Sequence, residues 1–276
     1  MNTLKTELTI GLDAPVTLLH ISDTHLALAD ERDCERKREL AERRAPSFRR
    51  AEEMLQAASQ MQKETGHLII HTGDLLDFVS EANLDRAKAF VTENDVFFAA
   101  GNHEFSQYVG EAFEDADYRN QSLAKVQAAF ANDIRFASRI VGGVNLVAID
   151  DGYYLFDGEF LPRLKAEAAK GLPIILLMHN PLFEEKLYDV MMERDRAKVA
   201  YLTATPLPLM AHYSEYRLRQ QTADEATLAM VDYIKSEPLI QAIIAGHLHF
   251  DYEGMVTDTL PQIVTGTTTV REILVK

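Results

Sequence analysis

Short apolar runs alternate along the chain with longer stretches in which apolar residues recur at helical spacing. The runs are typical of strands buried on both faces, and they cover residues 16–21, 67–72, 95–100, 144–149, 173–178 and 240–245. Between them, Phe48, Ala51, Leu55 and Ala58 share one face of a predicted helix, and further helices are predicted at 81–92, 121–131, 159–170 and 222–236. This alternation predicts an α/β fold.

The end of the chain, about 251–275, holds short β-rich pieces broken by glycine and proline, and we expect these pieces to finish a sheet. No internal repeat and no low-complexity linker interrupts the sequence. We therefore expect one domain over residues 1–276, with an insertion at about 184–221 that is rich in tyrosine and arginine.

Residues 30–53 carry eight acidic and eight basic side chains. Opposite charges four residues apart, such as Asp33 and Lys37, are typical of a solvated helical face. A basic recognition element is the alternative, but the interleaved acids weaken its field.

The composition is that of an ordinary globular protein, with 47% hydrophobic and 26% charged residues among 276. The formal net charge of −15 argues against a large nucleic-acid partner, which normally needs a basic surface.

Cys34 is the only cysteine, so a reducing compartment is the simpler expectation. The sequence shows neither a signal-like start nor an apolar run long enough to span a membrane, and we expect a cytoplasmic protein without a membrane partner.

Side chains with metal-ligating atoms directly follow five of the predicted strands. These groups are Asp23 and His25, Asp74 and Asp77 of Gly-Asp-Leu-Leu-Asp, Asn102 and His103 of Gly-Asn-His-Glu, His179, and His247 and His249 of Gly-His-Leu-His. Residues at i and i+2 of an extended chain point to the same side, so the two pairs with that spacing can each grip one ion. Parallel strands through one core would place all five groups at a single edge.

The donor set mixes nitrogen and oxygen and contains no thiolate. It suits Mn, Fe, Zn or Co better than Ca or Mg. This number of ligating side chains exceeds what one ion needs, so two ions that share a carboxylate are expected. A single polar residue after a strand is more often a helix cap or a core residue, and we interpret His20 and His71 as core residues and His212 as a surface residue. Five clusters together favour a metal site.

These motifs, in this order over residues 16–250, resemble those of the calcineurin-like metallophosphoesterase superfamily. The resemblance implies a four-layer αββα sandwich with two mixed β-sheets and a dinuclear metal site at one edge. It implies two metal ions, with Mn, Fe or Zn expected. One ion would be held by Asp23, His25, Asp74 and His249, and the other by Asp74, Asn102, His179 and His247.

The resemblance also implies hydrolysis of a phosphoester by a hydroxide that bridges the two metals. His103 would be the general acid, and Asp77 would orient and charge it. A carboxylate at the N-terminus of the helix 81–92 is the alternative reading of Asp77. The serine/threonine phosphatases of this superfamily carry Arg-Gly after the second motif, whereas Phe78 and Val79 stand here. This departure favours a phosphodiester, such as a cyclic nucleotide or another small diester.

We therefore expect a metal-dependent phosphodiesterase that acts on a small phosphoester. The alternatives within the enzyme class are a phosphomonoesterase, a nucleotide pyrophosphatase or a DNA-repair nuclease. A pseudoenzyme that serves as an interaction scaffold would be expected to have lost ligands or His103, and none is lost.

The segment 184–221 lies between two ligands in sequence, so at least its ends should approach the site. Tyr213 and Arg217 are candidates for a substrate-shaping cap, with a dimer contact or a plain surface helix as the alternatives.

Overall fold

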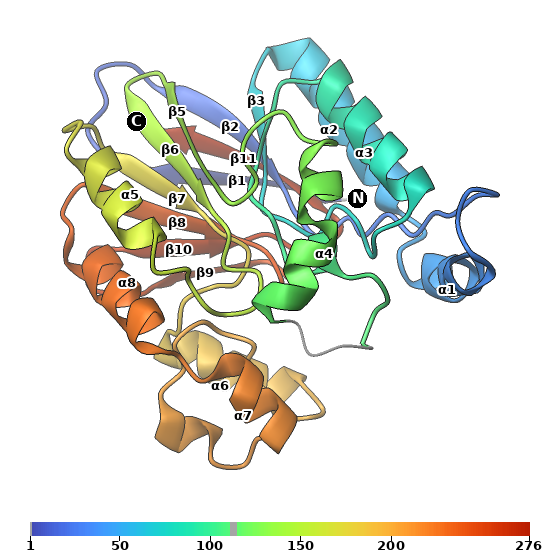
Figure 1. The fold of residues 1–276 in the computed structure, drawn as a ribbon. Helices are drawn as coiled ribbons and strands as arrows, with labels where there is room; N and C mark the ends of the chain where they lie inside the picture. The colour runs from blue at the N-terminus through green and yellow to red at the C-terminus, as the bar shows by residue number, and fades with distance from the viewer. Residues whose placement is uncertain (1, 111–114) are drawn as a thin grey trace.

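The computed structural model describes residues 2–110 and 115–276, and two β-sheets lie face to face at its centre (Figure 1). The first sheet has the strand order β1 (Asn2–Leu8), β11 (Thr269–Val275), β2 (Val16–Ile21), β3 (Leu68–His71) and β4 (Val96–Phe98). β1 runs parallel to β11, and β2, β3 and β4 run parallel to one another, but β11 pairs with β2 in the antiparallel direction. The sheet is therefore mixed.

The second sheet is also mixed. Its order is β5 (Phe136–Val141), β6 (Val144–Ile149), β7 (Ile174–Leu177), β8 (Ile240–Ala245), β10 (Pro261–Val264) and β9 (Tyr252–Met255). The four inner strands are parallel, and β5 and β9 close the two edges in the antiparallel direction.

Helices cover the outer faces of both sheets (Figure 1). α2 (Ala51–Thr65) and α3 (Glu81–Glu93) pack on the first sheet, and α5 (Phe160–Ala168) and α8 (Glu225–Ser236) pack on the second. Between the sheets lies a third apolar core, which includes Leu18, Ile70, Leu146, Ile175 and Ile244. Three apolar layers separate four layers of secondary structure, so the αββα sandwich implied by the sequence motifs is confirmed.

The remaining helices lie beside this sandwich. α1 (Glu35–Arg44) exposes most of its charged side chains and buries only Leu40 and Ala41, as expected for a solvated face, whereas Arg44 at its end is half-buried. α4 (Ala116–Gln127) lies beside the first sheet. α6 (Glu185–Arg194) and α7 (Glu215–Gln221) belong to the segment 184–221 and lie together at one end of the molecule (Figure 1). None of the helices in the described ranges has the length and apolar composition needed to cross a bilayer.

All six strands predicted from apolar runs are present, but two further strands were missed. β1 places exposed polar side chains beside its buried ones, and β5 buries only Phe136 and exposes Ser138 and Ile140. Both lie at sheet edges, and neither forms a continuous apolar run. The helix predicted at 121–131 lies at Ala116–Gln127. It begins where Asp115 accepts a hydrogen bond from the backbone amide of Tyr118, a capping contact that apolar spacing does not reveal.

Candidate metal centre

Five loops meet at the place where parallel strands of both sheets have their carboxyl ends. The loops after β2, β3 and β4 come from the first sheet, and those after β7 and β8 come from the second. The expectation that parallel strands of one core align all five groups is therefore wrong in one respect: the groups are divided between two sheets, which face each other across the central core. The predicted side chains nevertheless meet in one place.

The loops hold several of these residues in the left-handed backbone conformation. Five non-glycine residues of the centre have positive φ angles: Asp23 (55°), His25 (50°), Asp74 (57°), His247 (68°) and His249 (58°). Each costs about 1–2 kcal/mol relative to the right-handed form, and such strain concentrates at functional sites. Hydrogen bonds between the loops hold this geometry, because the amide of Asp23 donates to Gly73 (3.0 Å) and that of His25 donates to Asp74 (2.8 Å).

Glycines in the motifs allow the loops to approach one another. A Cβ atom at Gly101 would overlap the Oδ1 atom of Asp74, and one at Gly246 would overlap Ser22 and Asp23. The glycine that precedes the polar residues is therefore required by close packing of the neighbouring loop.

Asp23, His25 and His249 form the first cluster of ligating atoms. The Nε2 atoms of His25 and His249 lie 3.0 Å apart. Asp23 Oδ1 lies 3.4 Å from the His249 nitrogen and 3.9 Å from that of His25. Asp74 Oδ2 is also near, 3.6 Å from His25 Nε2.

Asp74, His179 and His247 form the second cluster. His179 Nε2 lies 3.2 Å from Asp74 Oδ2 and 3.1 Å from His247 Nδ1. The same carboxylate oxygen of Asp74 thus faces both clusters. The buried Oδ1 atom of Asn102 has no hydrogen-bond partner in the part of the chain that the structure describes.

These residues fit a pair of cations. His179 Nδ1 donates to the carbonyl oxygen of Thr72 (2.7 Å), and His25 Nδ1 lies 3.1 Å from Asp77 Oδ1. Both contacts fix the tautomer that turns the Nε2 lone pair toward the centre, as is typical of metal-binding histidines. Lone pairs that face each other at about 3 Å, with carboxylates and an unpartnered amide oxygen beside them, are the mixed donors that borderline divalent metals prefer.

Without a cation, the charges of the centre act strongly on one another. Burial opposes the charged form of His179, but the neighbouring carboxylates of Asp74 and Asp23 raise its pKa to about 10. Burial likewise disfavours the Asp74 carboxylate, but the surrounding histidines hold its pKa well below the usual range. Positive charge beside the Asp74 carboxylate therefore stabilises its ionised form.

Two buried carboxylates hold the loops from behind. Glu104 accepts hydrogen bonds from the amides of Gly101 (2.6 Å), Asp74 (2.8 Å) and Leu76 (3.1 Å). Burial and the neighbouring Asp74 raise its pKa to about 7. Asp151 accepts from the amide of His179 (2.8 Å), and burial raises its pKa to about 6. Glu104 and Asp151 therefore support the loops of the centre, and Asp151 was not singled out from the sequence.

His103 lies beside the first cluster, at the start of a short helix over His103–Phe105. Its Nδ1 atom donates to the carbonyl oxygen of Asp77 (2.7 Å) and lies 3.4 Å from Asp77 Oδ1. Asp77 therefore holds this ring through its backbone and its side chain together. Ser80 caps α3 by accepting from the amide of Asn83 (3.1 Å), so Asp77 is not the cap of that helix.

Arg44, at the end of α1, was not predicted as a site residue. Its Nε and Nη2 atoms donate to the two carboxylate oxygens of Asp77, at 2.7 and 2.8 Å. Burial raises the pKa of Asp77, but Arg44 and His25 outweigh it and hold that pKa below the usual range. The guanidinium also lies 5.2 Å from the ring of Phe48, which stacks on His25 with 4.2 Å between ring centroids.

We expect Arg44→Ala to lower kcat about 10- to 100-fold, the range typical of lost partners of metal ligands. The loss should fall mainly on kcat, because Asp77 would no longer be held against His25 and His103. Steady-state kinetics on a phosphoester measures the effect, with the exposed neighbour variant Arg43→Ala as the matched control. Equal kcat in both variants, with both folded, would contradict this role.

Tyr154 is a second residue that the sequence did not reveal. Its hydroxyl lies 2.7 Å from His247 Nε2, so that His247 turns Nδ1 toward His179. Tyr154 itself has a φ of 67°, in the left-handed backbone region. Its signal in the sequence is only its place after β6, without a motif.

Tyr154→Phe should weaken binding of the second metal ion about 10- to 100-fold, because the ring of His247 loses the hydrogen bond that orients it. Equilibrium dialysis against Mn²⁺ measures the change, and Tyr233→Phe, on α8 and bonded to Glu237, is the control. Unchanged affinity for both ions would show that packing alone orients His247.

The segment 184–221 reaches the centre through Tyr201, whose ring lies edge-on to His247 with 6.0 Å between centroids. The guanidinium of Arg217 lies 5.0 Å from the ring of Tyr201. Tyr213 is buried and accepts a hydrogen bond from the amide of Ala200 (2.7 Å), so it holds the segment together. His212 is exposed and lies 2.7 Å from the carbonyl oxygen of Lys198.

Among solved structures, a dimetal phosphatase of Danio rerio is similar at 13% identity, with 91% of this chain and 88% of that chain covered and a TM-score of 0.47. A phosphopantetheinyl hydrolase of Mycobacterium tuberculosis is similar at 12% identity, with 92% and 90% covered and a TM-score of 0.44. A 5'-nucleotidase of Candida albicans is similar at 13% identity, with 91% and 46% covered and a TM-score of 0.42.

A comparison with curated proteins gave no match. The sequence profile of calcineurin-like phosphoesterases, in contrast, matches residues 16–251, which include every residue of the two clusters. This chain therefore belongs to the calcineurin-like phosphoesterase family, whose members are metal-dependent phosphoester hydrolases.

Proposed function

We propose that the protein hydrolyses a small phosphodiester at this centre. The observation that carries the proposal is the shared oxygen of Asp74, which lies 3.6 Å from a histidine nitrogen of the first cluster and 3.2 Å from one of the second. One ion would be held by Asp23, His25, Asp74 and His249. The other would be held by Asp74, Asn102, His179 and His247.

Two bound cations supply a nucleophile at neutral pH and neutralise charge on the phosphoryl oxygens. The other requirement of the reaction is a proton for the leaving alkoxide. His103 is the side chain that would donate it, because imidazole titrates near neutral pH. Its Nδ1 is held by Asp77, so the ring would present Nε2 to the leaving oxygen. Arg44 keeps Asp77 ionised and fixed.

A diester is favoured over a monoester by the charge available for the phosphoryl group. Phe78 and Val79, which follow Asp77, are buried and apolar, and neither offers a cation. Arg44 reaches the same region but uses two of its donors on Asp77. A diester carries one negative charge at phosphorus where a monoester carries nearly two, so it needs less cationic help from the protein.

Hydrolysis of bis-p-nitrophenyl phosphate and p-nitrophenyl phosphate by the Mn²⁺-reconstituted protein tests the proposal. We expect a higher kcat/KM for the diester, with turnover lost on chelation. A higher kcat/KM for the monoester would replace the diester assignment with a phosphomonoesterase. Turnover of neither ester with two metal ions bound would contradict the proposed activity.

A further inference from the structure

Arg271, on β11, is buried in the protein with only 2% of its surface exposed. Its guanidinium donates to Thr6 Oγ1 (2.7 Å) and to the carbonyl oxygen of Val264 (3.2 Å), and it pairs with Asp251 and Glu253. A buried charge of this kind is costly unless its donors all have partners. The remaining donor, Nε, bonds to a buried hydroxyl group.

A chain of buried hydrogen bonds begins at that hydroxyl group. Arg271 Nε donates to Thr265 Oγ1 (2.9 Å), and the same oxygen lies 2.8 Å from His20 Nδ1. On the other side of the ring, His20 Nε2 lies 2.8 Å from Thr72 Oγ1, which donates to Ser22 Oγ (2.9 Å). All of these side chains are buried. The chain therefore joins β11 and the loop after β10 to the loops after β2 and β3.

The hydrogen bonds of this chain run in one direction. A guanidinium donates and never accepts, so Thr265 accepts from Arg271 and turns its own proton toward His20 Nδ1. Burial and the charge of Arg271 lower the pKa of His20, which keeps the ring neutral. A neutral imidazole that accepts at Nδ1 carries its proton on Nε2, and His20 donates that proton to Thr72. Each hydroxyl group of the chain thereby accepts one hydrogen bond and donates one.

The chain ends at a carbonyl oxygen that holds a candidate metal ligand. Ser22 Oγ donates to the carbonyl oxygen of Thr72 (3.3 Å), and the same oxygen accepts from His179 Nδ1 (2.7 Å). The bond from His179 fixes the tautomer in which its Nε2 atom faces Asp74 (3.2 Å). Because Thr72 is held by His20 through its side chain, the position of its carbonyl oxygen depends on the chain.

We propose that Arg271, Thr265 and His20 are positioning residues for the second cluster and act on His179 through Thr72. Their role rests on the two-metal centre of the proposed function. None of the three supplies an atom to a metal ion or to the substrate. Their effect is on the affinity for the ion that His179 would hold, and it gives His20 a role beyond that of a core residue.

Thr265→Val tests the chain, because it removes the hydroxyl group and leaves the ion pairs of Arg271 in place. We expect the Kd of one of two Mn²⁺ ions to rise about tenfold, the low end of the range for lost partners of metal ligands. The Kd of the other ion should stay unchanged, and equilibrium dialysis measures both. Thr265→Ser keeps the hydroxyl group and should restore the wild-type values. Thr205→Val is the matched control, since it removes a buried hydroxyl group that donates to Leu202 (3.0 Å), outside the chain.

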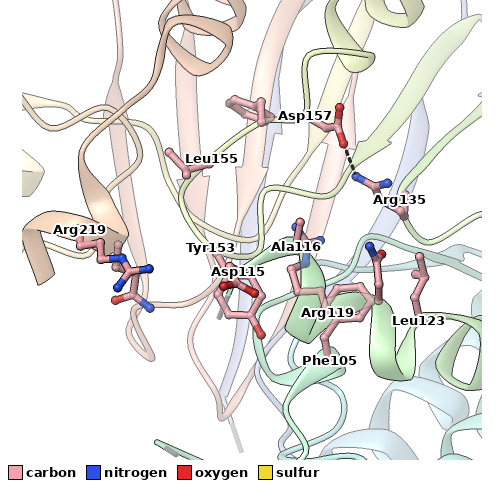
Figure 2. Close-up of a pocket in the computed structure, with 13 residues that line it drawn as sticks. Phe105, Asp115, Ala116, Arg119, Leu123, Arg135, Tyr153, Leu155, Asp157 and Arg219 are labelled. Carbon is pink, nitrogen blue, oxygen red and sulfur yellow. Dashed lines mark hydrogen bonds and ion pairs between the residues drawn. The ribbon is translucent and has the colours of Figure 1, made fainter. Parts of the chain in front are cut away.

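Arg271→Lys keeps the positive charge but removes the Nε donor to Thr265. It should raise the same Kd about tenfold, and the double variant should raise it no further, because both substitutions break one chain. Arg135→Lys is the control, because Arg135 also pairs with several carboxylates, among them Asp157, which is drawn beside it in Figure 2. Thermal unfolding checks that each variant folds.

Nitrogen-15 NMR of the Zn²⁺-loaded wild type reads the tautomer of His20, and we expect its proton on Nε2. A proton on Nδ1, unchanged affinity in Thr265→Val, equal weakening of both ions, or additive effects in the double variant would overturn the positioning role. Two bound ions without turnover of any ester would refute the proposed function alone, since the affinities still test the chain. A wild type that binds no second ion would overturn both.

Discussion

Asp74→Asn is expected to lower kcat about 10³-fold, because metal ions supply several kcal/mol of transition-state stabilisation. One oxygen of Asp74 faces both clusters, and its other oxygen accepts a hydrogen bond from the amide of His103 (2.8 Å). An amide would keep the size of the side chain but would remove the negative charge that both cations would share.

The metal content of the same variant separates this explanation from simple misfolding. We expect Asp74→Asn to bind fewer than two Mn²⁺ per chain at concentrations that saturate the wild type. Asp95→Asn removes a carboxylate that pairs with Arg139 at the surface, so it should leave both metal content and kcat unchanged. Full metal content with full activity in Asp74→Asn would show that the two metal ions do not share Asp74.

His103→Ala has the second largest expected effect. Loss of a general acid costs about 10²–10⁴-fold, and the size of the loss should follow the leaving group. Nitrophenolate leaves readily without a proton, so the loss on bis-p-nitrophenyl phosphate should lie near 10²-fold, the low end of that range. A diester with an alkyl leaving group needs the proton, and its hydrolysis should fall further.

The dependence on the leaving group is the informative part of this prediction. The control is His212→Ala, which also replaces a histidine with alanine, at an exposed position of the segment 184–221. An equal loss on nitrophenyl and alkyl esters would mean that His103 supports the loop and does not donate the proton.

The strands and the motif residues were predictable because each carries a local signal. An apolar run such as 174–177 needs burial on both faces, and a glycine such as Gly101 followed by Asn102 and His103 marks a sharp turn with ligating side chains. The family resemblance added how these groups divide into two clusters, which spacing alone does not give.

The residues that the sequence did not reveal act over long distances in the chain. Arg44 lies 33 residues before Asp77, in a segment whose mixed charges indicate only a solvated helix. Tyr154 lies 93 residues before His247. Such pairs form only after the sheets have packed, and no periodicity or motif marks Arg44 or Tyr154. The edge strand β1 was missed for a related reason, since it pairs with β11 from the opposite end of the chain.

The two-metal centre is the central claim, and metal titration tests it most directly. The metal-free protein is titrated with Mn²⁺ while bound metal, phosphodiester turnover and the unfolding temperature are measured on the same samples. We predict two ions per chain, with turnover that rises as the second ion binds. The unfolding temperature should also rise, because a ligand at about 100 times its Kd stabilises the folded state by about 2.7 kcal/mol. Turnover that persists in chelator, or saturation at fewer than two ions in active protein, would contradict the account.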